Sequence, residues 1–222
     1  MKKHLVFVFF LAAVLCSTYT EAQYYIRPPM DRRYHDRRSP EYSREDLGAF
    51  KPSLNISVGY GFPNLDKSYL PAFYQAYIGS ASQQGPLTAA VDYQFSRYMS
   101  IGLLATHGTV SAPYYDYNST GSAAFTGKLT NWSFLVDLVR YMPVNSQVVS
   151  PYIRTAIGLN TWSQQYTDVT GAKIDGVSAN NLPGLAYQAG IGAKFNLSKR
   201  AGLFAEAGYG KFILHGGMSF RF

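Results

Sequence analysis

The strongest constraint on the fold is a period-two alternation of apolar residues with small or polar ones, which begins near Lys51 and continues to the end of the chain. A period of two places successive side chains on opposite faces of a β-strand. The segments cover 7 to 13 residues, a range that includes the length that a tilted strand needs to cross a bilayer and exceeds the typical length of strands in soluble proteins. The eight expected strands are 54–62, 87–95, 99–106, 132–139, 153–159, 185–197, 203–209 and 212–222.

The connections between these segments alternate between long and short. Long stretches lie at 63–86, 107–128 and 163–184, whereas 96–97, 142–150 and 198–199 are shorter. The last connection departs from the pattern and is expected to close as a two-residue type II′ turn at Gly210-Lys211. Long loops at one rim and short turns at the other predict an all-β fold, an eight-stranded antiparallel up-and-down transmembrane β-barrel, with both termini on the short-turn side.

The composition of the two strand faces indicates which face meets lipid. A soluble barrel of the lipocalin type also alternates, but its outer face is dense in Lys, Glu and Thr. Here one face is small and mostly neutral, which suits the narrow interior of an eight-stranded barrel, and charged residues are only 15% of the chain. The other face is large and apolar, with aromatic residues expected at two rims. The first rim comprises Tyr60, Phe62, Trp132, Trp162, Tyr187 and Phe212, and the second Tyr93, Phe95, Phe195, Phe220 and Phe222.

The first 50 residues have a different character. Lys2 and Lys3 precede an apolar run, and Ala22 ends a small-residue site, so residues 1–22 are predicted to be a secretory signal peptide. Cleavage there would remove Cys16, the single cysteine, so no disulfide is expected. Residues 23–50 are rich in Arg, Tyr and Pro without a regular period, and predict a disordered tail. The tail is interpreted as a solvated linker, with a phosphate-contacting arm as the alternative.

The predicted signal peptide, the eight strands and the terminal aromatic residue resemble the small outer-membrane β-barrel superfamily of Gram-negative bacteria, the OmpA-, OmpX- and OmpW-like barrels. The resemblance covers residues 51–222, the expected barrel. It implies a bacterial outer-membrane location with periplasmic termini and outer-membrane lipid as the surroundings. A secreted chain has little access to genomic DNA, so no nucleic-acid partner is expected, and no cofactor is predicted. The last strand resembles the assembly signal of the family, which implies transient binding to the barrel-assembly machinery. The residues that carry this signal are His215, Gly217, Phe220 and Phe222.

Seven titratable side chains point into the barrel by strand parity. Buried charges are costly unless they are paired, so a mutually neutralising network that fills the lumen is expected. The expected turn places Glu206 opposite His215, where the carboxylate would favour the charged imidazolium. This pair is either a pH-sensitive element or a purely structural one. The predicted lumenal charge network comprises Asp92, Asp137, Arg154, Lys194, Glu206, His215 and Arg221.

Hydrolytic chemistry finds little support in the sequence. His107 lies on the lipid side near Thr109 and Ser111 without an acid to orient it, and Ser219 is too far along its strand from His215. The loop carboxylates are not spaced as metal ligands. No catalytic residue and no metal site is therefore predicted.

The long loops are rich in aromatic residues. Exposed tyrosines offer large amphipathic contact area, so these residues are candidates for recognising an extracellular ligand; alternatively, they pack on one another to order the loops. The sequence leaves three functions open: a structural or surface-binding barrel, a narrow channel for ions or small solutes, and an outer-membrane hydrolase. The candidate recognition residues are Tyr69, Phe73, Tyr74, Tyr77, Tyr114, Tyr115 and Tyr117.

Overall fold

The computed structural model describes residues 50–222 except 119–120, 145, 147 and 180. The predicted signal peptide and nearly all of the predicted tail lie outside these residues. The described part contains nine strands and one short 3-10 helix, η2. Their bounds are β1 Ser53–Phe62, η2 Leu65–Tyr69, β2 Ala76–Ile78, β3 Ser82–Gln94, β4 Met99–Asp116, β5 Phe125–Tyr141, β6 Val149–Asp168, β7 Leu185–Asn196, β8 Ala201–Tyr209 and β9 Leu214–Arg221.

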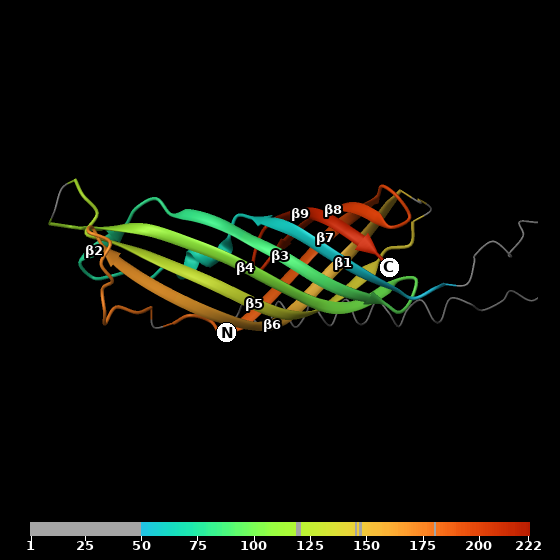
Figure 1. Cartoon of the computed structure of the whole chain (residues 1–222), viewed down its shortest axis with the longest axis horizontal. Helices are drawn as coiled ribbons and strands as arrows, with labels where there is room; N and C mark the ends of the chain where they lie inside the picture. The colour runs from blue at the N-terminus through green and yellow to red at the C-terminus, as the bar shows by residue number, and fades with distance from the viewer. Residues whose placement is uncertain (1–49, 119–120, 145, 147, 180) are drawn as a thin grey trace, which may run out of the picture. The chain divides into compact units, whose positions relative to one another are not determined.

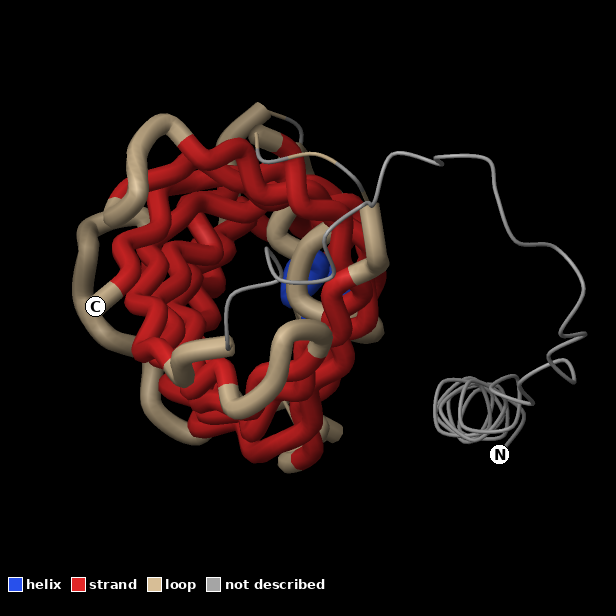
Figure 2. Tube along the Cα trace, turned by 90° about the vertical axis from the view of Figure 1, so that its right-hand side faces the viewer, coloured by secondary structure: helices blue, strands red, loops and turns tan. Residues whose placement is uncertain are grey.

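Eight of the nine strands close into a ring. The sheet runs β4-β3-β1-β9-β8-β7-β6-β5, and pairing of β4 with β5 joins its ends (Figure 1). Every pairing in the ring is antiparallel, and β2 adds only three residues against the far end of β4. Seen from one end, the strands enclose the single short helix (Figure 2). The predicted eight-stranded up-and-down barrel is confirmed.

The two ends of the barrel differ. Short connections at 95–98, 142–148 and 197–200 lie at one end, which we call the turn end. The connections 63–81, 117–124 and 169–184 lie at the other end, the loop end. The connection between β8 and β9 also lies at the loop end, although it is short, as the sequence indicates.

Three strands are much longer than the sequence predicts. β4, β5 and β6 have 18, 17 and 20 residues, so β4 and β5 take up most of the stretch 107–128 that was expected to be a loop, and β6 takes up the first six residues of the stretch 163–184. The alternation does continue there, but with polar residues outside and buried residues such as Val110 and Leu129 inside. This arrangement is the reverse of the apolar-outside pattern that identified the membrane strands.

The turn between β8 and β9 is also wider than predicted. The segment between the two strands is 210–213, and the Gly208 N–H donates to the Ile213 carbonyl at 2.7 Å. The side chain of Phe212 is fully buried inside the barrel instead of lying in an aromatic rim. Trp162 likewise lies on the inward side of β6, where its Nε1–H donates to the Pro183 carbonyl at 2.9 Å. The prediction that Phe212 and Trp162 belong to an outward-facing aromatic rim was therefore wrong.

A broad apolar band covers the outside of the ring. Outward side chains such as Leu103, Phe134 and Leu159 are 66%, 59% and 67% exposed. In water, exposure of so many large apolar side chains around a whole barrel would be highly unfavourable, whereas acyl chains accommodate them. Among the residues that the structure describes, no helix is long and apolar enough to cross a membrane.

Candidate functional site

The centre of the lumen on the turn-end side is a single arginine surrounded by three carboxylates. The Arg154 guanidinium lies 3.1 Å from Asp137 through Nε, 3.3 Å from Glu206 through Nη1 and 3.5 Å from Asp92 through Nη2. All four side chains are almost completely buried. In such an arrangement the charges compensate one another, and removing the cation would leave several carboxylates without solvent or partner.

The strand register explains why these groups meet. Asp92, Gly102 and Asp137 are directly paired across β3, β4 and β5, and all three positions face inward. Gly102 carries no side chain between the two carboxylates, and a Cβ atom there would collide with Asp92 Oδ1 and with Asp137 Oδ1. The glycine therefore allows both acids to extend over the same strand toward Arg154.

The two other predicted cations meet at a neutral side chain, Asn55. Lys194 Nζ donates to Asn55 Oδ1 at 3.2 Å, and Arg221 Nε donates to the same oxygen at 3.4 Å. Tyr152 donates its hydroxyl to Glu206 Oε2 at 3.1 Å. Asn55 and Tyr152 were not among the predicted residues, because neutral polar side chains do not stand out in a search for charges.

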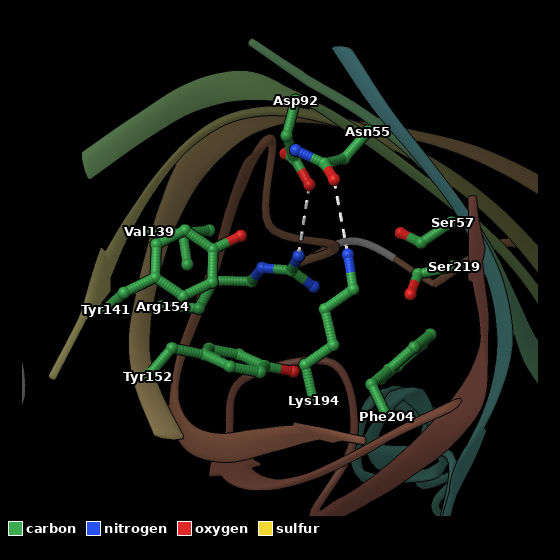
Figure 3. A pocket seen from close by; sticks show the side chains of 10 residues that line it. All are labelled: Asn55, Ser57, Asp92, Val139, Tyr141, Tyr152, Arg154, Lys194, Phe204 and Ser219. Atoms are coloured by element: carbon green, nitrogen blue, oxygen red, sulfur yellow. Dashed lines mark hydrogen bonds and ion pairs between the residues drawn. The ribbon is translucent and has the colours of Figure 1, made fainter. Parts of the chain in front are cut away.

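Little space remains between these side chains. The cavity beside Arg154 and Lys194 has a volume of about 20 Å³, which is room for about one water molecule (Figure 3). Among the described residues, no group of three or more His, Cys, Asp or Glu side chains is placed to hold a metal ion.

His215 has one predicted partner, Glu206, and one that the sequence did not reveal, Thr88. The register pairs it with Glu206, and its Nδ1 lies 4.0 Å from Glu206 Oε2. Its Nε2 lies 2.6 Å from the Thr88 hydroxyl oxygen, so a hydroxyl, an imidazole and a carboxylate follow one another in the order used by hydrolases. Thr88, His215 and Glu206 are only 7%, 4% and 3% exposed, however, so a substrate has no access to the hydroxyl.

The other histidine considered for hydrolysis lies on the outside of the barrel. The His107 ring stacks on Trp132 with a centroid distance of 4.2 Å. Ser219 does not complete a site around His215, since its hydroxyl donates to the Gly202 carbonyl at 3.4 Å.

Small and branched apolar side chains close the lumen next to the charged groups. They form one buried cluster along five neighbouring strands, β3 to β7, as expected for the narrow, side-chain-filled interior of an eight-stranded barrel. The members of this apolar layer are Ala90, Leu104, Leu135, Ala156 and Ala186.

A second ion pair occupies the lumen toward the loop end. Lys211 Nζ lies 2.6 Å from Asp66 Oδ1 and 3.3 Å from Asn160 Oδ1, so the pair joins helix η2 to the β8–β9 turn. Burial raises the pKa of Asp66 and lowers the pKa of Lys211, although each charge attracts the other. The pair was missed because both residues were assigned to connections, where charges are normally solvated.

Aromatic rings fill the interior at the loop end. Phe73 packs edge-on against Tyr114 and Tyr166 with centroid distances of 5.1 and 5.9 Å, and Tyr114 stacks on Phe125 at 4.7 Å. Tyr114 is fully buried, and its hydroxyl donates to the Pro71 carbonyl at 2.9 Å. The assignment of Tyr114 to an exposed recognition surface was therefore wrong, and Phe73 is also largely engaged in this packing.

The remaining loop tyrosines are not part of this aromatic cluster. Tyr77 stacks on Tyr115 at 5.3 Å and contacts Tyr117 at 5.6 Å, and Tyr74 is almost completely exposed. Tyr69 packs edge-on against Trp162 at 5.5 Å and is partly exposed. We call Tyr74, Tyr77, Tyr115 and Tyr117 the tyrosine surface.

The four residues of the predicted assembly signal lie in β9 and at its end. His215 and Gly217 are on the inward side, whereas Phe220 and Phe222 are exposed on the outside at the turn end. Their role in assembly stays a prediction.

The closed antiparallel ring with its outward apolar band defines the chain as an eight-stranded transmembrane β-barrel with a lumen filled by side chains.

No protein-family profile matches the chain, and the curated proteins give no match. Among solved structures, the chain is similar to a de novo designed transmembrane β-barrel, with 16% identity over 78% of this chain and 98% of the other and a TM-score of 0.42. It is similar to the attachment invasion locus protein Ail of Yersinia pestis, with 14% identity over 77% and 97% of the two chains and a TM-score of 0.42. It is also similar to the outer membrane protein OprG from Pseudomonas aeruginosa, with 10% identity over 77% and 95% and a TM-score of 0.44. These likenesses concern the fold alone.

Proposed function

We propose that this protein is a non-conducting barrel of the bacterial outer membrane that presents the tyrosine surface to a ligand outside the cell. Its termini lie on the periplasmic side, outer-membrane lipid surrounds it, and the barrel-assembly machinery binds it transiently during insertion. The observation that carries the proposal is the succession of filled layers in the lumen: the charged network, the apolar layer, the Asp66–Lys211 pair and the aromatic cluster.

A narrow channel is the main alternative. Conduction requires a continuous water-filled path, and the cavity beside Arg154 holds only about one water. The buried Thr88, His215 and Glu206 side chains likewise argue against a hydrolase, because catalysis requires contact between the nucleophile and a substrate.

Planar-bilayer recording tests the closed lumen. We expect the inserted full chain to give no conductance steps because the apolar layer interrupts any water path. The Leu104→Gly/Leu135→Gly double variant removes the two largest side chains of that layer and is the matched positive control for detecting a path. Regular ion-selective steps from the unmodified protein that change on Asp137→Asn substitution would establish a channel and refute the proposal.

Binding through the tyrosine surface requires a separate test, with immobilised glycan and peptide arrays as the probes. We expect the inserted barrel to bind a subset of features, and Tyr74→Ser/Tyr77→Ser/Tyr117→Ser to weaken that binding by about thirtyfold or more, because exposed tyrosines act as binding hot spots. Tyr98→Ser, which removes an exposed tyrosine at the turn end, is the control. Absence of binding, or binding equally strong in the triple variant, contradicts this role.

A further inference from the structure

The outer surface of β3–β6 changes from apolar to polar over a few residues along the strands. At the level of Phe134 and Leu159 it is apolar and exposed. The next outward residues toward the loop end are Trp132 and Thr161, paired with each other. Beyond them the outward residues are polar, so the Trp132 level marks the outer edge of the apolar band.

Polar side chains form two complete rows beyond this level, where a row means residues paired side by side across neighbouring strands. All eight face outward, and the hydroxyl oxygens of Thr109 and Thr130 lie 3.3 Å apart. We call these eight residues the hydroxyl ladder. The first row is Gln84, Thr109, Thr130 and Ser163, and the second is Ser82, Ser111, Lys128 and Gln165.

The ladder reaches farther than a phospholipid headgroup layer. Lys128, the ladder residue of β5 that lies farthest from the apolar band, is four residues from Trp132, which is about 13 Å along the strand and about 10 Å in height once strand tilt is included. A phospholipid headgroup region adds only about 5–8 Å on each side of the hydrocarbon core. Only a lipid whose headgroup is thicker than that of a phospholipid would cover the whole ladder.

The chemistry of the ladder differs from that of a water-facing or protein-binding surface. Lys128 is the only Asp, Glu, Lys or Arg among its eight residues, whereas soluble surfaces carry roughly 25–35% charged residues. The ladder contains no aromatic or large apolar side chain that could act as an anchor for a protein partner. Hydroxyls and amides, each able to donate and accept hydrogen bonds, fit a polyhydroxylated ligand, and Lys128 fits an anionic group on it.

We propose that the hydroxyl ladder binds the phosphorylated sugar headgroup of a glycolipid in the outer leaflet. The ladder is continuous with the lipid-facing band, so the occupant is a molecule whose acyl chains lie against Phe134 and Leu159 while its sugars rise along Thr130, Ser163 and Lys128. This inference rests on the proposed membrane location of the barrel.

The test uses the full chain in detergent micelles titrated with lipopolysaccharide that carries a phosphorylated sugar core, with the rise in melting temperature as the readout. We expect Thr130→Val/Ser163→Ala to raise the half-saturating concentration by about twentyfold, since each lost hydrogen bond is worth about a factor of five. Both substitutions are nearly isosteric and leave the strand backbone intact. Ser80→Ala/Ser122→Ala, which changes two exposed loop serines, is the matched control and is expected to stay within twofold of the unmodified chain.

Two further titrations show whether the acyl chains or the sugars of the glycolipid account for the binding. Phosphatidylglycerol supplies acyl chains and phosphate without sugars, and the deacylated phosphorylated oligosaccharide supplies sugars without acyl chains; we expect both to bind at least tenfold more weakly than the glycolipid. Equal saturation by phosphatidylglycerol, or equal affinity of the ladder variant and the unmodified chain, overturns the inference. Insertion into phospholipid vesicles is measured in parallel: failure to insert refutes the proposed function, whereas insertion without glycolipid preference refutes the ladder alone.

Discussion

Replacing Arg154 with Met is expected to destabilise the barrel by about 3–5 kcal/mol, because it leaves an uncompensated buried charge on three carboxylates. Asp92, Asp137 and Glu206 all lie within 3.5 Å of the guanidinium and have almost no contact with solvent. The measurement is the free energy of unfolding from a urea titration of the barrel folded into phospholipid vesicles.

Two variants make this result interpretable. Lys199→Met removes a cation from the exposed β7–β8 turn and is expected to change stability by no more than about 0.5 kcal/mol. Combining Arg154→Met with Asp92→Asn, Asp137→Asn and Glu206→Gln is expected to recover most of the loss, because no unpaired carboxylate then remains around residue 154. If Arg154→Met behaves like Lys199→Met, the carboxylates are solvated and the lumen is open to water.

Replacing Leu103 with Lys is expected to destabilise the folded barrel in vesicles by about 2–4 kcal/mol, the cost of a lysine on the lipid face near the bilayer centre. Leu103 is 66% exposed, midway between Met99 at the turn end of β4 and His107 at the outer edge of the apolar band. The same urea titration measures the effect.

The control lies on the same face of the same strand. Ser111→Lys is beyond the apolar band and is expected to cost about 0–1 kcal/mol. A barrel that folds in water would show the opposite order, since an exposed Leu→Lys substitution there relieves an apolar patch. A neutral or stabilising Leu103→Lys therefore contradicts the membrane assignment.

The ring of eight strands was predictable because lipid imposes a simple pattern. Outward residues within the bilayer are apolar, so strands such as β1 and β7 can be identified in the sequence by the regular alternation of apolar residues with small or polar ones. The pairing of Glu206 with His215 also followed from the sequence, because a short antiparallel connection fixes the register.

The ends of β4, β5 and β6 were not predictable by the same reasoning. Beyond Trp132 the outside of the sheet is polar, so polarity no longer distinguishes a strand from a loop. Burial there depends on tertiary packing, as in Tyr114, whose ring is covered by Phe73 from a distant connection. A single sequence with no contact information does not reveal such packing.

The residues of the lumen were predicted better than their contacts. Strand parity identifies Arg154 and the three acids as inward-facing, but it does not say which acid reaches the guanidinium. Thr88 was overlooked because a lone threonine in a strand carries no signal until the register brings it to His215. Lys211 was overlooked because its inward orientation depends on the local path of the turn.

The unequal strand lengths make the barrel asymmetric around its axis, because the two sides differ in height at the loop end. β4, β5 and β6 rise well above the bilayer as a wall, whereas β8 and β9 end at its surface. A large molecule approaching laterally from the β8–β9 side meets a low rim, and one approaching from the β5 side meets the wall. The extramembrane surface of the barrel is therefore one-sided: nearly all of its height stands over β4, β5 and β6.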